Sequence, residues 1–237
     1  MRIRFFNESF LKTILKHKRI KYQLNILVIA AHPDDEVLGM GGTIKKLTKK
    51  KNRVDLCVIS EGASAQYKNE NMIKVRKEAC KKAGKILGIS SITFLDYPDM
   101  QLDKISHLEL NIKLEEIIQT KKPQIVYTTP YNDLNKDHQI VFDSTLVATR
   151  PKSNYVKEIL CYELPGFSKT PFHPTIYEDI SLEISMKLKA FKCYKSEIQL
   201  HPLPRTFDAI NNLATIRGIE SGLKKAESFQ LIKKIIS

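Results

Sequence analysis

The sequence predicts an α/β protein with a Rossmann-like, doubly wound and mostly parallel sheet that is flanked by helices. Two observations predict this fold. Short apolar runs rich in β-branched residues alternate with longer stretches of helical periodicity. The length of 237 residues, with 42% hydrophobic and 27% charged residues, is ordinary for one globular domain. We therefore expect a single domain over residues 23–237, preceded by a basic N-terminal extension over residues 1–22.

The strands are expected where apolar runs are short and bounded by turn residues. Residues 24–31 (LNILVIAA) form a continuous apolar run, which is typical of a strand buried on both faces. Further strands are expected at residues 54–60, 92–95, 125–129, 159–164 and 176–180. Helices are expected at residues 36–51, 69–87, 108–118, 139–149, 182–200 and 207–221, the second of them ending at Gly88.

The glycine-rich run at residues 39–42 (GMGG) follows an acidic turn and lacks the spacing of a dinucleotide-binding loop. Acidic residues directly before a phosphate cradle would also repel phosphate. We interpret these glycines as positions that let the start of a helix lie close to the sheet or to a substrate.

The net charge of +13 favours anionic partners, but the basic residues are spread along the chain. They do not alternate with aromatic residues, so nucleic-acid binding is not expected. We interpret the charge as a mostly solvated basic surface that contains a local anion site. No run is long and apolar enough to span a bilayer, although an amphipathic start leaves a peripheral membrane contact open.

Four widely spaced cysteines, Cys57, Cys80, Cys161 and Cys193, form no C-x-x-C pair. Free thiols of this kind are typical of a reducing compartment, so we expect a cytoplasmic protein. Homo-oligomer formation stays open at this level.

The first predicted strand runs directly into the motif AHPDDE at residues 31–36. Ligands of open parallel sheets bind beyond the carboxyl ends of the strands, which is where this turn lies. A structural turn needs one Asp as a helix cap, and it does not need a histidine and three acids. Carboxylates this close repel one another unless a cation or a proton neutralises them. The motif therefore indicates a divalent metal ion.

The fourth predicted strand ends in the loop PYNDLNKDH at residues 130–138. In a doubly wound sheet the first and fourth strands can be neighbours, so His138 can face His32 and Asp35 across the crevice. Two imidazoles and one carboxylate leave one position open for water, as a catalytic zinc site requires. Taken singly, a loop histidine or an Asp-Asp pair is ordinary; together at two strand ends they favour a metal site.

At this point the sequence resembles the PIG-L/LmbE family of zinc-dependent N-acetyl-sugar deacetylases. The resemblance extends over residues 24–235. It rests on AHPDDE at residues 31–36, VRKE at 75–78, YPD at 97–99, DLNKDH at 133–138, TRP at 149–151, YE at 162–163, RG at 217–218 and AESF at 226–229. The pattern at residues 133–138 resembles a branch associated with bacterial surface-glycan or lipopolysaccharide synthesis.

The resemblance implies that His32, Asp35 and His138 bind Zn²⁺, with another divalent metal left open. Asp34 would be the general base that takes a proton from the metal-bound water, which attacks the amide carbonyl. Arg76 and Asp99 match family positions that hold sugar hydroxyls. The expected activity is hydrolysis of the N-acetyl group of an amino sugar or glycoconjugate.

Residue 135 departs from the family pattern. Many members have a histidine there, which stabilises the oxyanion or protonates the leaving amine, whereas this chain has Asn135. Asparagine can donate a hydrogen bond to an oxyanion but cannot supply a proton at neutral pH. We therefore expect either Asp34 to return its proton to the amine or another group, such as His201, to act as the acid. Loss of activity is the third option.

Glu36 is expected to support the turn or the start of the helix. A nucleotide-linked or lipid-linked sugar carries phosphates, which Arg150 or Arg205 would meet, although a structural salt bridge explains Arg150 equally well. The alternative function is a nucleotide-binding or glycosyltransferase-like module without deacetylase activity, and the acidic turn argues against it.

Overall fold

A seven-stranded mixed sheet forms the centre of the protein, in a computed structural model that describes residues 23–67, 71–151, 155–166 and 168–236. The strand order is β3-β2-β1-β4-β5-β7-β6. The strands are β1 (Asn25–Ala30), β2 (Arg53–Ser60), β3 (Ser91–Tyr97), β4 (Ile125–Thr128), β5 (Glu158–Tyr162), β6 (Ile176–Asp179) and β7 (Ala226–Lys234). The run from β3 to β5 is parallel, whereas β7 lies antiparallel to both of its neighbours. The predicted mostly parallel, single-domain α/β fold is confirmed.

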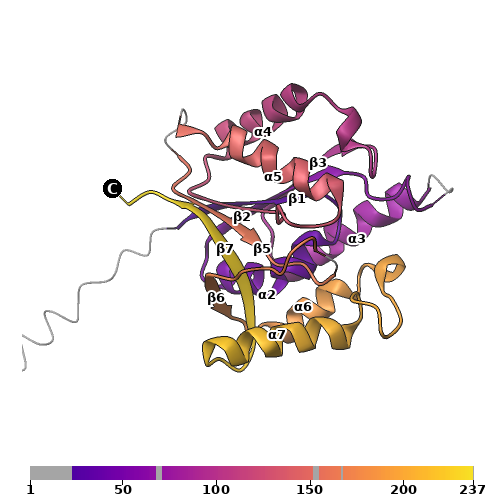
Figure 1. Ribbon diagram of the computed structural model, residues 1–237, viewed down its shortest axis with the longest axis vertical. Coiled ribbons are helices and arrows are strands. Elements are labelled where there is room, and N and C mark those ends of the chain that lie inside the picture. The colour runs from indigo at the N-terminus through magenta and orange to yellow at the C-terminus, as the bar shows by residue number, and fades with distance from the viewer. Residues whose placement is uncertain (1–22, 68–70, 152–154, 167, 237) are drawn as a thin grey trace, which may run out of the picture.

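Helices cover both faces of the sheet (Figure 1). They are α2 (Asp35–Lys49), α3 (Asn71–Leu87), α4 (His107–Lys121), α5 (Lys136–Ala148), α6 (Ile184–Phe191) and α7 (Phe207–Ser221), with 3₁₀ turns at Leu102–Lys104 and Lys195–Glu197. The helices α2, α3, α6 and α7 pack into one apolar core, and α4 and α5 pack into a second. The side chains of β1 alternate between the cores, Val28 entering one and Leu27 and Ile29 the other.

The strands β1 and β4 are neighbours, as the sequence predicted. The helix after β1, α2, packs on one face of the sheet, and the helix after β4, α5, packs on the other. Because the two connections leave the sheet in opposite directions, a crevice opens at the carboxyl ends of these strands. The motifs at residues 31–36 and 133–138 therefore meet at this crevice.

The helix α2 is interrupted at Met40, where the backbone has φ −147° and ψ 26°. Such an interruption removes helical partners from backbone groups on both sides of it. The N–H groups of Gly42 and Thr43 donate instead to the carboxylate of Glu227 on β7, at 2.9 and 2.6 Å. Glu227 thus acts as a cap for the second half of the helix.

A buried lysine completes this arrangement. The Nζ atom of Lys187 on α6 donates to the carbonyl oxygen of Leu38 at 2.8 Å and to Glu227 Oε1 at 2.7 Å. The glycines of the run explain its close packing, because a Cβ atom on Gly39 would lie 2.3 Å from the ring of Tyr162 on β5. The interpretation that these glycines bring the helix close to the sheet is confirmed.

Some boundaries differ from the sequence prediction. The helix expected over residues 182–200 is wrong beyond Phe191, because the chain turns so that Tyr194 enters the core and donates to Glu36. The strand β7 was not expected, and α5 begins at Lys136, so His138 lies on a helix and not in a loop. The extension expected over residues 1–22 lies outside the described residues. No helix in the described ranges has the length and apolar character needed to cross a bilayer.

Candidate metal centre

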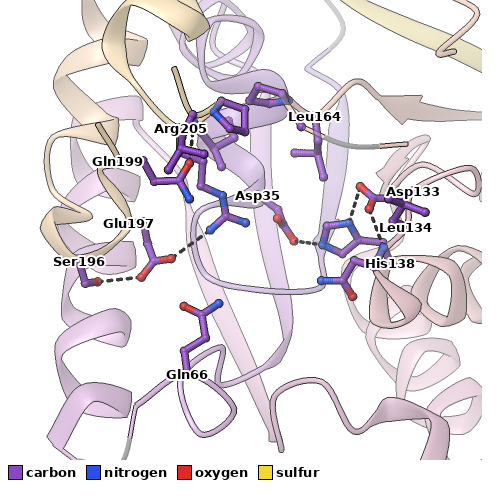
Figure 2. A pocket seen from close by; sticks show the side chains of 16 residues that line it. Asp35, Gln66, Asp133, Leu134, His138, Leu164, Ser196, Glu197, Gln199 and Arg205 are labelled. Carbon is purple, nitrogen blue, oxygen red and sulfur yellow. Dashed lines mark hydrogen bonds and ion pairs between the residues drawn. The ribbon is translucent and has the colours of Figure 1, made fainter. Parts of the chain in front are cut away.

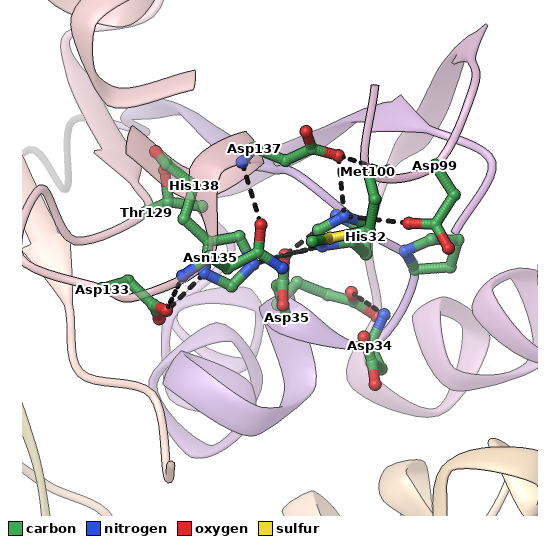
Figure 3. Close-up of polar contacts among 12 residues, drawn as sticks. His32, Asp34, Asp35, Asp99, Met100, Thr129, Asp133, Asn135, Asp137 and His138 are labelled. Carbon is green, nitrogen blue, oxygen red and sulfur yellow. Dashed lines mark hydrogen bonds and ion pairs between the residues drawn. The ribbon is translucent and has the colours of Figure 1, made fainter. Parts of the chain in front are cut away.

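Three potential metal-ligand atoms, of His32, Asp35 and His138, converge at the crevice (Figure 3). We call these three residues the metal cluster. His32 Nδ1 lies 3.1 Å from His138 Nε2, and Asp35 Oδ2 lies 3.6 Å from the former and 3.4 Å from the latter. His32 follows β1, Asp35 begins α2, and His138 lies in the first turn of α5. All three side chains are buried. The structure therefore brings together the ligand set that the resemblance implied.

The spacing of these atoms fits zinc. Nitrogen and oxygen ligands at about 2.0–2.1 Å from a tetrahedral zinc ion lie roughly 3.3 Å from one another. The second oxygen of Asp35, Oδ1, is buried and has no hydrogen-bond partner among the described residues. Two imidazole nitrogens and a carboxylate with an unsatisfied oxygen form a donor set that suits a divalent cation.

The outer nitrogens of both histidines face carboxylates. His138 Nδ1 lies 2.9 Å from Asp133 Oδ2, and His32 Nε2 lies 3.2 Å from both Asp99 Oδ1 and Asp137 Oδ2. A carboxylate at one ring nitrogen holds the proton there and leaves the other nitrogen as a lone-pair donor. The two lone-pair nitrogens therefore point toward the centre of the cluster.

The cluster concentrates negative charge. Burial acts to lower the pKa of His138, but Asp35 and Asp133 outweigh it and raise the pKa to about 9. Burial acts to raise the pKa of Asp35, yet the two histidines hold it well below its ordinary value. The same excess of carboxylates that binds protons here also favours a metal cation.

Asp34, the expected general base, has a strained backbone and a fully buried side chain. Its φ of 133° is rare for a residue with a Cβ atom and costs on the order of 1–3 kcal/mol. The turn is held by Glu36, whose Oε2 accepts from the Asp34 N–H at 3.1 Å and whose Oε1 accepts from Tyr194. Burial, together with the neighbouring Asp34, raises the pKa of Glu36 to about 8. Glu36 thus supports the turn, as the sequence indicated.

Two arginines contact the Asp34 carboxylate. Arg76 Nη2 lies 3.4 Å from Oδ1, and Arg205 Nη1 lies 3.2 Å from Oδ2. Burial raises the pKa of Asp34, and the two guanidinium groups oppose that rise. Arg76 is only 2% exposed and also donates to the carbonyl oxygen of Pro33 at 2.7 Å and to Glu197. Arg76 therefore fixes the turn that carries Asp34.

A small cavity of about 30 Å³ lies beside His32. Its lining includes Arg76 and Asp99, the two residues that match sugar-binding positions of the family. Arg76 Nε and Asp99 Oδ2 are both buried without a hydrogen-bond partner in the described part of the chain. One unsatisfied donor and one unsatisfied acceptor therefore belong to residues of the same cavity wall.

Asn135 caps α5, its side-chain oxygen accepting from the Asp137 N–H at 2.9 Å. It lines both the small cavity and a larger cleft. Arg150 is not brought to the site: its side chain is half exposed and pairs with Glu115 at 3.2 Å, outside the linings of both cavities. His201, the other acid considered from the sequence, is also absent from both linings.

A cleft of about 400 Å³ opens in front of the metal cluster (Figure 2). Its lining is chemically mixed. The polar residues include Gln66, Glu197, Gln199 and Arg205, and the apolar ones are Leu38, Leu134, Leu164, Pro165, Leu203 and Pro204. The cleft therefore suits a ligand with both polar and apolar surfaces.

Several of these residues were missed by the sequence analysis. Asp133 and Asp137 lie in the same motif as His138, and this proximity was the available signal. The sequence does not indicate that Glu197 and Gln199 line the cleft, because the pattern of residues 182–200 predicts a helix. Arg205 was considered for phosphate binding only, and the structure places its guanidinium against Asp34.

Comparison with known proteins identifies the family of the chain. The sequence profile of the PIG-L family, described as GlcNAc-PI de-N-acetylase, matches residues 27–149. The uncharacterized deacetylase YaiS of Escherichia coli K12 is 33% identical over 180 residues, which cover 72% of this chain and 90% of that protein. The chain belongs to the PIG-L family.

Two further PIG-L relatives extend the similarity. The diacetylchitobiose deacetylase of Thermococcus kodakarensis is 25% identical over 226 residues, or 89% of this chain and 84% of that one. A crystal structure of the N,N'-diacetylchitobiose deacetylase from Pyrococcus horikoshii matches with a TM-score of 0.75 at 22% identity, covering 98% and 94% of the two chains. The similarity to these proteins therefore extends beyond the region that the family profile matches.

The matched PIG-L region contains the entire metal cluster and its surrounding carboxylates. Glu197 and Arg205, which are part of the cleft lining, lie beyond that region. The candidate metal ligands thus lie in the part of the chain that matches the family profile, and the C-terminal wall of the cleft, which includes Glu197 and Arg205, is contributed by a segment outside it.

Proposed function

We propose that the protein is a zinc-dependent N-deacetylase that hydrolyses the acyl amide of an amino sugar or glycoconjugate. The convergence of His32 Nδ1, Asp35 Oδ2 and His138 Nε2 beside Asp34 is the observation that carries the proposal. The family membership and the names of the relatives, which include a diacetylchitobiose deacetylase, support the same reaction. The nucleotide-binding alternative is not favoured, because four carboxylates, of Asp35, Asp99, Asp133 and Asp137, lie against the two histidines and would repel a phosphate there.

A bound zinc ion would polarise the amide carbonyl and activate a water molecule. Asp34 accepts the proton of the attacking water; it directly precedes Asp35 in the chain, and its buried carboxylate is held in place by Arg76 and Arg205. The Asn135 Nδ2 group has no partner among the described residues and can donate a hydrogen bond to the substrate, but an amide has no proton to transfer. Asp34 therefore also returns the proton to the leaving amine, which makes one carboxylate both base and acid.

A hydroxyl group of the sugar enters the small cavity beside His32, while the rest of the sugar occupies the larger cleft. A sugar hydroxyl is both a donor and an acceptor, so it satisfies Asp99 Oδ2 and Arg76 Nε together. Burial without partners leaves a cost of about 1–3 kcal/mol per group, which ligand binding would remove. This unsatisfied pair supports the substrate-binding role of both residues.

The cellular setting follows the resemblance of residues 133–138 to surface-glycan enzymes. We infer that the substrate is an intermediate of bacterial surface-glycan synthesis in the cytoplasm. The four cysteines are free and three of them are buried, which supports a reducing compartment. The free, nucleotide-linked and lipid-linked forms of the sugar share the acetamido group and differ in the carrier.

Acetate release from a panel of N-acetylhexosamine derivatives tests this function. The panel contains free, nucleotide-linked and lipid-linked forms, each assayed with and without a chelator. We expect acetate from at least one form, its loss with the chelator and its return with added Zn²⁺. A protein that holds one equivalent of zinc and releases no acetate from any form would overturn the proposed reaction.

A further inference from the structure

The metal cluster lacks a cationic group at residue 135. Asn135 commits its side-chain oxygen to the Asp137 N–H at 2.9 Å, so only its amide nitrogen is free for a ligand. A neutral amide stabilises a developing negative charge less well than a fixed cation, because charged hydrogen bonds are roughly twice as strong. The position of Asn135 therefore raises the question of which residue faces the charge that develops on the amide oxygen.

Arg205 is the cation that faces the cleft. The side chain of Arg205 is 26% exposed, whereas that of Arg76 is 2% exposed. The terminal nitrogens of Arg76 already contact Pro33, Asp34 and Glu197. The Nη1 atom of Arg205 contacts both Asp34 and Glu197, while Nη2 and Nε have no partner in the described residues. Figure 2 shows the guanidinium between Glu197 and Asp35. Its unpaired N–H groups are therefore available to a ligand in the cleft.

Two hydrogen bonds join the ends of the segment that carries Arg205. The Gln199 N–H donates to the carbonyl oxygen of Arg205 at 3.0 Å, and the Arg205 N–H donates to the side-chain oxygen of Gln199 at 3.1 Å. These reciprocal bonds tie together the two ends of residues 199–205. The backbone at Arg205 is thereby fixed before any ligand binds.

Glu197 holds the guanidinium itself. Its carboxylate bridges the two arginines, with Oε1 on Arg76 and Oε2 on Arg205 at 3.0 Å. It also accepts from the hydroxyls of Tyr67 at 3.2 Å and Ser196 at 2.9 Å. A charge that is fixed in place before the reaction is the arrangement that stabilises a transition state most effectively.

We propose that Arg205 is a catalytic residue that stabilises the negative charge on the substrate's amide oxygen, in the role that Asn135 leaves open. This inference rests on the proposed deacetylase function. As water adds to the amide carbon, the carbonyl π electrons move to the oxygen beside Arg205, and the water proton goes to Asp34. The oxyanion electrons then re-form the carbonyl as the C–N bond breaks, the electrons of that bond stay on nitrogen, and Asp34 returns the proton to the amine, which leaves acetic acid and the amino sugar. Arg205 keeps all its protons throughout.

Two arginine substitutions test this role against a matched control. Arg205→Gln should lower kcat by about 10²–10³-fold with KM changed only a few-fold, which is the cost of removing one oxyanion donor. Arg205→Lys keeps the charge and should lose less. Arg53→Gln is the control, because Arg53 pairs with Asp55 at the start of β2, outside the linings of both cavities.

A compensating substitution and a small-molecule rescue separate catalysis from structure. Adding Asn135→His to the Arg205→Gln variant should raise its kcat at least tenfold, because the substitution returns a cationic donor to the cluster. Guanidinium ion at millimolar concentration should likewise raise the activity of Arg205→Ala and leave Arg53→Gln unchanged. A purely structural role predicts no rescue by either route.

Binding of a tetrahedral phosphonamidate analogue of the substrate gives a readout apart from turnover. Its affinity, measured by calorimetry, should fall in Arg205→Gln by about the same factor as kcat/KM, while affinity for the amino-sugar product changes little. Equal loss for analogue and product would make Arg205 an ordinary substrate contact and overturn the inference. If the wild-type protein releases acetate and Arg205→Gln is equally active, the inference about Arg205 is also overturned. If the wild-type protein itself shows no turnover, the deacetylase function is refuted.

Discussion

His138 Nδ1 lies 2.9 Å from Asp133 Oδ2, and this contact orients the imidazole so that Nε2 faces His32 and Asp35. Asp133 is in turn fixed by its own backbone neighbours, since its Oδ1 accepts from the Asn135 N–H at 2.8 Å. A carboxylate behind a histidine ligand sets the tautomer and raises the basicity of the nitrogen that faces the metal. Asp133 therefore acts on a metal ion through His138.

Asp133→Asn should weaken zinc binding by about 10–100-fold, because an amide no longer holds the Nδ1 proton with a full negative charge. Competition with a coloured chelator measures the affinity. Asp143→Asn is a suitable control, since Asp143 lies exposed on α5, the helix that carries His138. Equal zinc affinity in both variants would show that Asp133 only caps the turn.

His32→Ala removes a ligand and should abolish stoichiometric metal binding. Wild-type protein should hold one divalent ion per chain, and the remaining Asp35 and His138 cannot form a three-ligand site. Elemental analysis after dialysis against a trace of chelator measures the content. Retention of one zinc ion by His32→Ala would place the metal elsewhere in the chain.

Asp34→Asn should keep its metal and lose turnover. The substitution preserves the shape of the side chain but removes the base, and loss of a general base costs on the order of 10²–10⁴-fold in kcat. Because Asp34 carries both proton transfers in the proposed mechanism, the loss should lie at the upper end of that range. Acetate release and zinc content are measured on the same sample, and full activity with normal metal content would remove Asp34 from this role.

The position of the candidate metal ligands was predictable, because His32 and Asp35 come directly after a buried strand and His138 lies in the segment that follows a neighbouring strand. The apolar run that ends at Ala31 indicates where the first strand stops, and His32 and Asp35 fall at the next positions. The neighbouring position of β4 follows from doubly wound topology, which brought in His138. Pattern and topology together were therefore sufficient for this part of the site.

The C-terminal wall was not predictable because tertiary contacts decide its structure. Residues 182–200 have helical periodicity, but Tyr194 is drawn to Glu36 and Glu197 to Arg76, and these buried contacts end the helix early. The position of Arg205 depends in turn on that segment. Strand β7 was missed because its sequence, AESFQLIKK, mixes polar and apolar residues without the alternation expected of a strand.

The buried pair of Lys187 and Glu227 gives the last prediction, which concerns stability. Both side chains are at most 5% exposed, and together they bond the backbone groups that the interruption of α2 leaves free. Glu227→Gln should lower the free energy of unfolding by about 3–5 kcal/mol, because it leaves the Lys187 charge buried without a carboxylate. Urea denaturation measures the change.

Lys187→Met should cost less than Glu227→Gln, because two backbone N–H groups still bond the carboxylate when the ammonium group is gone. The double variant should be more stable than the sum of the single losses predicts, since the two side chains are in direct contact. Glu116→Gln is the control, as Glu116 pairs with Lys113 on the exposed surface of α4 and should leave the urea midpoint unchanged. Strictly additive losses would mean that Lys187 and Glu227 stabilise the interruption of α2 independently, and not as a pair.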